Sequence, residues 1–521
     1  MSKDQLKEEG NALFVKKKYG LAALKYTEAI EVDEGNAILY ANRAACRLNL
    51  KQWAIELDPS YAKGWARLAT AHDCLYAYKP STQAWRKALE SLPKENLNAS
   101  EQKQKAQYEE GLKVAEAKLN KPLEPAQVVY YKDNDEHPWV EGRRLVEQYQ
   151  HTKFLNSSAW LINEAYNDFK EGLDLMNAMV QQKNPRTGEL LIQSRNGALL
   201  TNGLLLDKRV FHATGNFFDL YNKQAQSECN TVRAWTSTGP EGIMRELPER
   251  LAREGWSSVR PALSVTLRCW IMRAHIDAGL QHRYDIALEF FTRIIQVLTW
   301  GRETYKDVPN SEKGVIFADT FIVGVRKLYL DTIIGAYSEK PDKQLLQDLY
   351  EEAEEVMKEV EKLPSPANTV GGIGPGFFLG FYLYPKSDAQ AAFGYYHAKQ
   401  AALPGITAAA AKDHWTKSIS AYIQAADFIP EDDEQHPWYL NVALEYMDKI
   451  PTNLESKLRM YERIRLSLPK ADKIWHGSAH SKAQIKQHYQ RLAEIEQDLR
   501  NGLIAGKWTL DSVVTRDRVS S

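Results

Sequence analysis

The stretch Leu6–Phe14, LKEEGNALF, gives the first indication of the fold of this chain. Small and apolar residues recur at spacings of three and four along it and along the stretch that follows, which places them on one face of each of two successive helices. Two antiparallel helices can approach closely where the facing residues are small. The pattern therefore predicts a helical hairpin, carried by Leu6, Gly10, Leu13, Ala22, Tyr26 and Ala29.

The same hairpin pattern returns twice further along the chain. A second unit starts near Ala37, with Tyr40 and Ala44 in its first helix, and a third starts near Ala62. The third unit holds the repeat positions Trp65, Ala69, Trp85, Ala88 and Pro93. The polar-faced segment 101–119 then suits a helix that caps the array. The period and the residue types resemble the tetratricopeptide repeat, a helix–turn–helix of about 34 residues.

The second unit is too short for a complete repeat. Only 25 residues separate its start at Ala37 from Tyr61, because LNLKQW runs directly into AIELDP after Trp53. About nine residues, or two and a half turns, are missing from its second helix. Either that helix is vestigial in the protein or the sequence carries a gene-model or splice deletion, and the sequence leaves both explanations open.

Composition excludes several classes of protein. The 67 basic and 68 acidic side chains give a net charge of −1, which removes a whole-chain case for binding nucleic acid or a membrane surface. No stretch is apolar over the roughly 20 residues that a membrane helix needs. The four cysteines have no metal-ligand spacing, and the opening MSKDQLKEEG lacks an apolar signal region. We therefore expect a cytoplasmic protein without metal or other cofactor.

The expected fold is all-α, with an N-terminal hairpin array over residues 1–120, a linker over 121–135 and a longer, divergent helical region over 136–521. The linker carries two prolines and loses helical periodicity. In the longer region three segments have the spacing of the second helix of a repeat. They are Tyr284, Ala287, Phe291 and Ile294; Tyr422, Ala425 and Pro430; and Tyr461, Ile464 and Pro469.

Other features of the longer region favour structural explanations. The tripeptides His137-Pro138-Trp139 and His436-Pro437-Trp438 each follow an acidic run and are typical of helix starts. The run 351–362, EEAEEVMKEVEK, indicates an amphipathic helix with Val356 and Val360 inward and its acidic residues in water. Between residues 186 and 212, glycines and short apolar runs indicate a loop with a small β-hairpin.

Five polar residues of the N-terminal array stand where packing alone does not require them. They lie on the first helices of the three units, which line the concave groove of such an array. Pairs four residues apart project from one helix face. Ammonium and guanidinium groups make charge-assisted bonds to carboxylates, and asparagine amides can hold a peptide backbone. The candidate binding residues are Lys7, Asn11, Asn42, Lys63 and Arg67.

The three first helices, LKEEGNALF, LYANRAA and AKGWARLA, resemble those of the carboxylate-clamp tetratricopeptide domains of heat-shock co-chaperones. The resemblance covers about 120 residues. It implies that the residues that bind the peptide in that family correspond to Lys7, Asn11, Asn42, Lys63 and Arg67. It implies binding of a Glu-Glu-Val-Asp tail at the C-terminus of a seventy- or ninety-kilodalton heat-shock chaperone. The region 136–521 would then serve a second protein partner that the sequence does not identify.

Two alternatives accompany this hypothesis. Each lysine or arginine taken singly is more typical of a solvated face than of a site, and the chain would then be a structural helical scaffold with a degenerate clamp. An enzyme is the second alternative, but GxSxG, HExxH and P-loop motifs are absent from the sequence. The histidines His476, His480 and His488 have no acidic or cysteine partner at matching offsets, so we expect neither a metal site nor catalytic residues.

Overall fold

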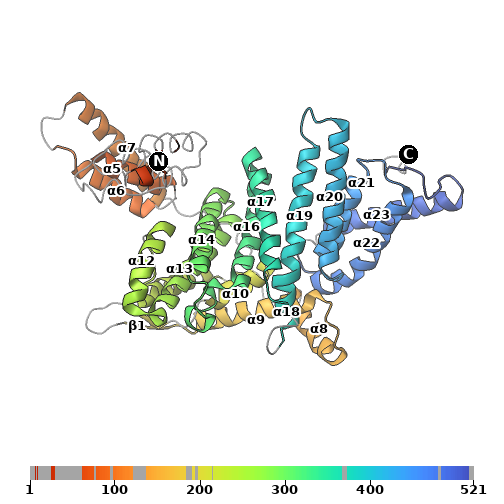
Figure 1. Cartoon of the computed structure of the whole chain (residues 1–521), viewed down its shortest axis with the longest axis horizontal. Helices are drawn as coiled ribbons and strands as arrows, with labels where there is room; N and C mark the ends of the chain where they lie inside the picture. The colour runs from red at the N-terminus through yellow and green to blue at the C-terminus, as the bar shows by residue number, and fades with distance from the viewer. Residues whose placement is uncertain are drawn as a thin grey trace. The chain divides into compact units, whose positions relative to one another are not determined.

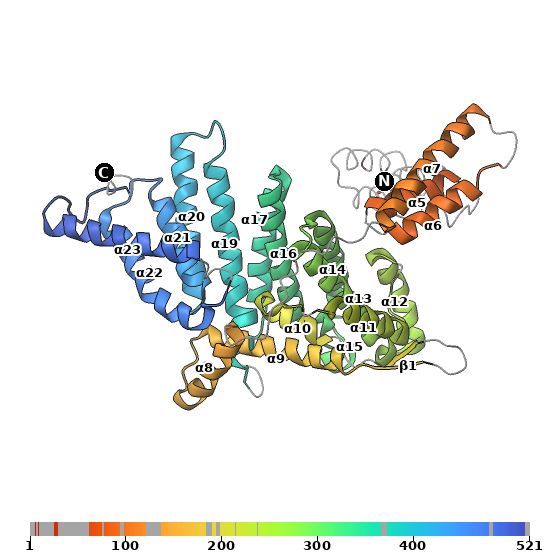
Figure 2. The same cartoon turned by 180° about the vertical axis from the view of Figure 1, so that it is seen from behind.

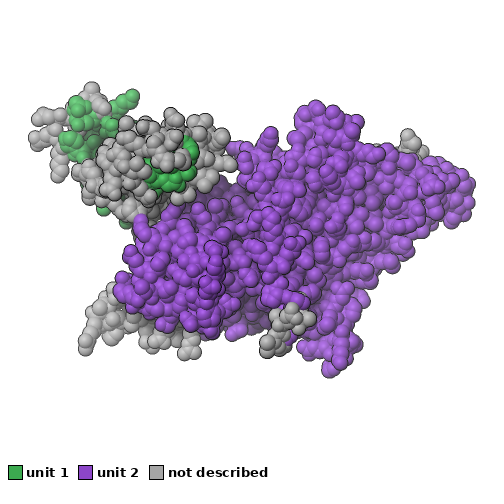
Figure 3. Space-filling model, in the orientation of Figure 1, with its two compact units in different colours: residues 1–126 green, residues 127–521 purple. Residues whose placement is uncertain are grey.

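The computed structural model describes residues 6, 9, 25–29, 62–74, 78–93, 98–120, 137–183, 190–193, 198–213, 215–236, 238–365, 372–478 and 483–515. Over these residues the fold is all-α apart from one two-stranded hairpin and one isolated bridge. The chain divides into two compact units, Met1–Ala126 and Gln127–Ser521 (Figure 3). The segment 121–135 lies outside the described residues, so its role as a linker remains a prediction.

Unit 1 contains the helices α5 (Ala62–Cys74), α6 (Tyr78–Glu90) and α7 (Ala99–Asn120). Helix α5 packs on α6, and α6 packs on α7, so each helix covers its neighbour in the chain. The predicted hairpin of the third unit is therefore present as α5 and α6. The predicted capping helix is α7, in which Tyr108 and Ala115 are the described residues that are buried.

Small residues and one tryptophan form the core of unit 1. Ala69 and Ala88 are fully buried and Trp85 is 6% exposed, as the repeat pattern predicts, while Trp65 is partly buried. Gly111 of α7 lies against the Trp85 ring, where a Cβ would come within 2.6 Å of ring carbons. Leu6, Tyr26 and Ala29 are also buried. Three predicted positions of the first unit are thus buried, whereas Gly10, Leu13 and Ala22 lie outside the described residues.

A capping box starts α7. The Asn98 side chain accepts a hydrogen bond from the Glu101 amide at 3.0 Å, and the Glu101 carboxylate accepts one from the Asn98 amide at 2.9 Å. This reciprocal pair satisfies two backbone donors that would otherwise lack partners at a helix N-terminus. The polar α7 is therefore held by its own start as well as by its packing on α6.

Unit 2 begins with helices that run across one end of a row of helices (Figures 1 and 2). This first group comprises α8 (Pro138–Thr152), α9 (Ser158–Asn177), α10 (Ala198–Leu206) and the short 3-10 helix η1 (Lys208–Val210). Strands β1 (Val180–Lys183) and β2 (Leu190–Gln193) pair antiparallel between α9 and α10. The β-hairpin is thus present, although it begins before the segment 186–212 in which it was predicted, and α10 occupies the second half of that segment.

The row itself consists of successive helices that pack side by side in unit 2. Its first half contains α11 (Phe217–Val232), α12 (Pro240–Glu254), α13 (Trp256–Gly279), α14 (Tyr284–Thr304), α15 (Asn310–Lys313), η2 (Val315–Phe317) and α16 (Asp319–Glu339). The second half contains α17 (Lys343–Glu361), α18 (Pro375–Phe378), the π-helical turn η4 (Leu379–Leu383), α19 (Tyr384–Ala401), α20 (Ala408–Phe428), α21 (Gln435–Met447), α22 (Leu454–Trp475) and α23 (Ala483–Ile504).

The three segments with repeat-like spacing lie on α14, α20 and α22. Most of their apolar positions are buried, as predicted: Ala287, Phe291, Ile294, Tyr422, Ala425, Tyr461 and Ile464. Gly394 of α19 lies so close to α20 that a Cβ would approach the Tyr422 ring to 2.6 Å. Pro469 is exposed within α22, so this proline does not end the helix as a repeat proline would.

Both His-Pro-Trp tripeptides start helices. His137 precedes α8 and Pro138 is its first residue, while His436 lies in the first turn of α21 after the acidic run that ends at Glu434. The Asp433 carboxylate accepts a hydrogen bond from the Gln435 amide at 2.8 Å. Burial lowers the pKa of His436 to about 4. The structural interpretation of these tripeptides is therefore confirmed.

No helix in the described part of the chain is both long and apolar enough to cross a membrane. The apolar stretch 371–384, which is the longest in the sequence, instead forms α18, η4 and the start of α19 within its described residues. Leu379 and Phe381 are buried there among other helices of unit 2.

Candidate functional site

Helix α5 carries the two candidate clamp residues that fall within the described helices. Lys63 is exposed, and Arg67 follows four residues later on α5, with its side chain outside the described part of the structure. Ala62, Ala66 and Ala69 form the buried side of α5. Because these alanines fix the rotation of the helix on α6, the exposed position of Lys63 follows from the packing of its neighbours.

The contacts between α5 and α6 hold this helix in place. The Ser81 hydroxyl donates a hydrogen bond to the Ala69 carbonyl at 3.1 Å, and the Lys87 ammonium lies 4.5 Å from the centre of the Trp65 ring. On the outer side, Arg86 pairs with Glu116 of α7 at 2.8 Å. Lys63 therefore projects from a helix whose position is set by two further helices of unit 1.

The other three candidate clamp residues, Lys7, Asn11 and Asn42, lie outside the described residues. The shortened second unit around Trp53 also lies outside them. The convergence of all five side chains on one groove therefore remains a prediction from the sequence.

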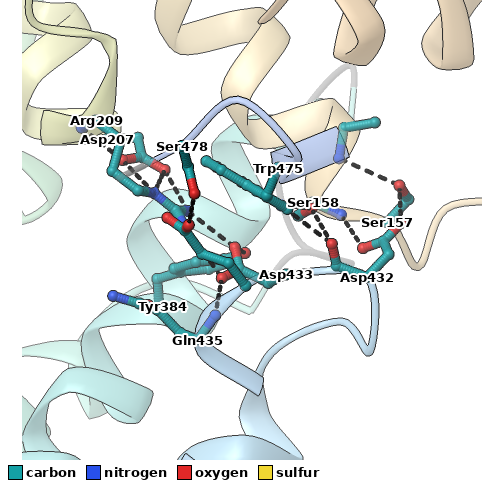
Figure 4. Close-up of polar contacts among 12 residues, drawn as sticks. Ser157, Ser158, Asp207, Arg209, Tyr384, Asp432, Asp433, Gln435, Trp475 and Ser478 are labelled. Atoms are coloured by element: carbon teal, nitrogen blue, oxygen red, sulfur yellow. Dashed lines mark hydrogen bonds and ion pairs between the residues drawn. The ribbon is translucent and has the colours of Figure 1, made fainter. Parts of the chain in front are cut away.

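Unit 2 contains a second concentration of polar side chains, centred on Arg209 (Figure 4). Its guanidinium contacts the Asp207 carboxylate at 2.6 Å and makes two parallel bonds to Asp433 at 2.9 and 3.0 Å. The guanidinium also lies 3.9 Å from the centre of the Trp475 ring. Tyr384 donates a hydrogen bond to the same Asp433 carboxylate. Residues from four distant parts of the chain therefore meet at one cation whose side chain is mostly covered.

The electrostatics of this cluster favour a charged network. Burial by itself would raise the pKa of Asp207, but the adjacent Arg209 guanidinium overrides it and holds that pKa below its usual range. Asp433 is fully buried and its two oxygens are shared by Arg209 and Tyr384. Removing one partner from such a network leaves a buried charge uncompensated.

A neighbouring set of bonds joins the start of α9 to the loop before α21. The Asp432 carboxylate accepts hydrogen bonds from the Ser157 hydroxyl at 2.5 Å and from the Ser158 amide at 2.7 Å, and its backbone carbonyl accepts one from the Trp475 indole at 3.0 Å. Ser157 also caps α9 through the Ala159 amide. These bonds connect residues about 275 positions apart, so they fasten the first helices of unit 2 to its last ones.

Further buried charges lie deeper in unit 2. The Lys327 ammonium donates a hydrogen bond to the Leu206 carbonyl at 2.6 Å, and burial lowers its pKa. Burial raises the pKa of Asp388 to about 6, although Lys327 and Lys208 oppose the shift. Lys208 pairs with Asp331 on α16. The segment Asp207–Arg209 thus supplies charged partners to Asp331 on α16 and to Asp433 before α21.

The acidic helix α17 corrects one prediction. Val356 and Val360 are buried as predicted, but Glu352 and Glu359 are buried as well and do not face water. Arg326 binds both Glu352 oxygens at 2.7 and 2.8 Å, and Arg302 pairs with Glu359 at 2.8 Å. Burial nevertheless raises the pKa of Glu352 to about 7. Two of the acidic residues of this run thus belong to interhelical ion pairs.

The sequence contained only a weak signal for these networks. The acidic run before His436 correctly predicts a helix start. Asp433 in that run also pairs with Arg209, which lies 224 residues earlier in the chain. No spacing rule connects positions that far apart. The short charged segment Asp207–Arg209 between two apolar stretches was the one local hint that charges enter the core of unit 2.

Metal binding has no support from the described part of the chain. There, no group of three or more histidine, cysteine, aspartate or glutamate side chains is arranged to hold an ion. Of the three histidines of the C-terminal cluster, His476 is exposed and His488 contacts the Asn441 side chain at 3.2 Å, while His480 lies outside the described residues. These two histidines therefore have the surroundings of ordinary surface and packing residues.

Comparison with known proteins identifies one region of the chain. No family model matches. The chain is 40% identical over 126 residues to small glutamine-rich tetratricopeptide repeat-containing protein 2 of Saccharomyces cerevisiae, which covers 22% of this chain and 35% of the relative. It is 37% identical over 100 residues to heat shock protein STI1 of the same yeast and 34% identical over 99 residues to Hsp70-Hsp90 organizing protein 1 of Glycine max. Each of these matches covers 17% of both proteins.

These similarities establish that the chain contains a tetratricopeptide-repeat region homologous to those of the organizing proteins and the small glutamine-rich co-chaperones. The chain spans 35% or less of the length of these three relatives. The structure of the P58(IPK) tetratricopeptide domain matches 96% of this chain and 98% of its own at 14% identity, but the TM-score of 0.20 is too low to support an argument about the fold.

The alignment with the first yeast relative also bears on the short second unit. It runs over 126 residues, whereas 22% of the 521 residues of this chain is about 115. The difference of about eleven positions is close to the nine residues that the repeat spacing finds missing after Trp53. The gaps in this chain along the alignment therefore total about the length of the missing segment.

Proposed function

We propose that this chain is an adaptor whose region 1–120 binds the C-terminal Glu-Glu-Val-Asp tail of a heat-shock chaperone. The observation that carries the proposal is the similarity, over about 100 residues, to proteins named for heat shock and for organising Hsp70 and Hsp90. The exposed position of Lys63 on α5 supports it, since a ligand-binding cation must be open to solvent. The chain acts through binding in this proposal, without catalysis.

The chemistry of the five residues suits this ligand. A peptide that ends in aspartate carries two carboxylates on its last residue. Lys63 and Arg67 supply an ammonium and a guanidinium one helical turn apart, and both form charge-assisted hydrogen bonds to carboxylates. Lys7 supplies the third cation, while Asn11 and Asn42 offer amides to the peptide backbone. Three cations facing a doubly anionic chain end give both attraction and orientation.

The proposal requires that the short second unit still places α5 correctly relative to the helix that bears Asn42. The missing residues would form about two and a half helical turns, and that helix determines how α5 lies relative to the helix that bears Asn42. A shifted α5 would separate Lys63 and Arg67 from Asn42. The second candidate function is therefore a helical scaffold with a degenerate clamp, and the shortfall of about nine residues is the observation that favours it.

A peptide titration tests the proposal directly. Full-length protein is titrated with a labelled peptide that ends in Glu-Glu-Val-Asp, and binding is followed by fluorescence anisotropy. We expect a dissociation constant on the order of micromolar and a loss of binding when the terminal carboxylate is amidated. The Lys63→Ala variant should bind about 10- to 100-fold more weakly, because one charge-assisted bond is removed.

Two matched variants make the titration specific. Lys103→Ala removes the same charge from an exposed position on α7 and should leave the affinity unchanged. Inserting nine residues after Trp53 restores the length of a complete repeat. Tight binding by the insertion variant, with none by the native chain, would identify the deletion as the cause of a degenerate clamp. Absence of binding by both chains would refute the chaperone-tail proposal.

A further inference from the structure

Two free cysteines of unit 2 lie next to each other on adjacent helices. Cys229 is in the last turn of α11 and Cys269 is in the middle of α13, and their sulfur atoms are 4.0 Å apart. Both side chains are half-buried, and the two positions are 40 residues apart in sequence. The packing of α11 on α13 thus brings together two thiols that sequence spacing did not connect.

The two sulfur atoms are within reach of a covalent bond. A disulfide has a sulfur–sulfur distance of about 2.05 Å. Rotation of a cysteine side chain from one staggered rotamer to another moves its sulfur by about 3 Å, so a change at χ1 covers the difference.

The surroundings make one thiol the better nucleophile. The hydrogen bond between the two sulfur atoms lowers the pKa of Cys229, although burial opposes this shift. That same bond to Cys229, followed by burial, raises the pKa of Cys269. The neighbouring Glu228 carboxylate raises both, and the Tyr221 hydroxyl contacts the Cys269 sulfur. Because the thiolate is the attacking form, Cys229 reacts first.

We propose that Cys229 and Cys269 form a modification site at which a low-molecular-mass disulfide, such as oxidised glutathione, converts the two thiols into a reversible intramolecular disulfide. The Cys229 thiolate attacks one glutathione sulfur, and the first glutathione leaves as a thiolate. Cys269 then loses its proton to solvent and attacks the Cys229 sulfur, which expels the second glutathione. Two protein thiols are oxidised and one glutathione disulfide is reduced to two thiols, so atoms and electrons balance.

The bond would fix the position of α11. The C-terminal end of this helix is already ordered by Arg233, which has a φ of 54°, and by a hydrogen bond from the Ala234 amide to the Cys229 carbonyl at 2.8 Å. Helix α11 also contacts β2 and α9. A disulfide to α13 therefore ties this edge of unit 2 to the inner row of helices and restricts its unfolding.

Peptide mapping tests the site in the full chain. Reduced protein is treated with oxidised glutathione, its remaining thiols are blocked, and it is digested with trypsin without reductant. The tryptic peptides Gln224–Arg233 and Cys269–Arg273 each contain one cysteine of the pair. We expect these two peptides to appear linked, with a loss of two hydrogen atoms, and to separate after dithiothreitol. The oxidised protein should melt a few degrees higher than the reduced one.

Three variants decide between this site and other thiol chemistry. Cys269→Ser should trap glutathione on Cys229, whereas Cys229→Ser should slow the modification of Cys269 and abolish the linked peptide. The double variant Cys46→Ser/Cys74→Ser should give the same linked peptide as the native chain. Links from Cys229 or Cys269 to Cys46 or Cys74, or stable glutathione adducts on both cysteines without a link, would overturn the proposal. Circular dichroism checks that each variant is folded.

Discussion

The two units are held together by different means. In unit 1 the described helices α5, α6 and α7 pack on their chain neighbours through alanines and Trp85, and the ion pair between Arg86 and Glu116 lies at the surface. In unit 2 the fully buried Asp433 pairs with Arg209, whose side chain is only 16% exposed, and this pair joins parts of the chain that are more than 200 residues apart.

This difference has an energetic consequence. A repeat array gains stability from each pair of neighbouring hairpins, so local packing decides its stability. Burying an ionic network costs desolvation energy. The attraction between its charges offsets that cost only when every partner is present. We therefore expect the stability of unit 1 to depend mainly on the volume of its packed side chains. The stability of unit 2 should depend more on single buried charged groups.

The largest expected effect is that of Asp433→Ala. The change removes one of the two carboxylates that bind the Arg209 guanidinium, the acceptor of the Tyr384 hydroxyl and the acceptor of the Gln435 amide at the start of α21. Breaking a buried pair by removing one partner costs about 3–5 kcal/mol. Urea unfolding, with hydrogen exchange read by mass spectrometry, should show the loss of protection in unit 2.

Asp427→Ala is the matched control for that change. Asp427 also forms an interhelical ion pair, with Arg463 at 2.5 Å, but its side chain is 55% exposed. An exposed pair contributes about 0–1 kcal/mol. Equal destabilisation by the two variants would show that burial of the Arg209 network is not what distinguishes unit 2.

A pH titration addresses the buried acid of α17. Burial raises the pKa of Glu352 from the ordinary value of 4.5 to about 7, so the folded state binds this proton more tightly than the unfolded state does. The stability that Glu352 contributes is therefore complete below about pH 4.5 and is lost as the pH rises to about 7. Asp388, with a pKa of about 6, changes stability in the same direction.

The Glu352→Gln variant isolates this contribution. Between pH 5 and 7.5 the free energy of unfolding of the native protein should fall by about 2–3 kcal/mol more than that of the variant. Glu354→Gln, at an exposed position on the same helix, should behave like the native protein. Parallel pH profiles for the native chain and Glu352→Gln would contradict the shifted pKa.

Gly111→Val tests shape in unit 1. A side chain at position 111 would meet the Trp85 ring at 2.6 Å and push α7 away from α6. Overpacking of this kind costs about 1–3 kcal/mol, which exceeds the gain of some tenths from replacing a helical glycine. Lys113→Val places the same side chain at an exposed position of α7, and it should leave exchange protection of α6 unchanged.

The smallest effect is expected from Asn98→Ala. The change removes the side chain that accepts a hydrogen bond from the Glu101 amide at the start of α7. Loss of an N-cap costs about 1 kcal/mol. Faster hydrogen exchange in the first turn of α7, without a change in unit 2, is the expected result, and Lys103→Ala serves as the control. Unchanged exchange at that turn would show that packing on α6 alone holds the helix.

Local pattern predicted most of the helical structure. Ala69, Trp85 and Ala88 in unit 1 and Phe291 and Ile294 in unit 2 are buried where helical spacing placed them. Lys63 is exposed on the first helix of the third unit, as the candidate site requires. These features depend on residues within one or two helices, and the periodicity of a helix fixes which of its faces is apolar.

The sequence by itself thus determined where helices form, how neighbours pair into hairpins, and that the chain resembles a tetratricopeptide array. Only the tertiary structure decided which charged side chains are buried. Helical spacing predicts that Glu352 and Glu359 are exposed to solvent. In the structure they pair with Arg326 and Arg302 instead. The same holds for Arg209 with Asp433 and for Cys229 with Cys269. The reason is physical: burial and pairing are properties of two segments at once, and periodicity within either segment contains no information about the other.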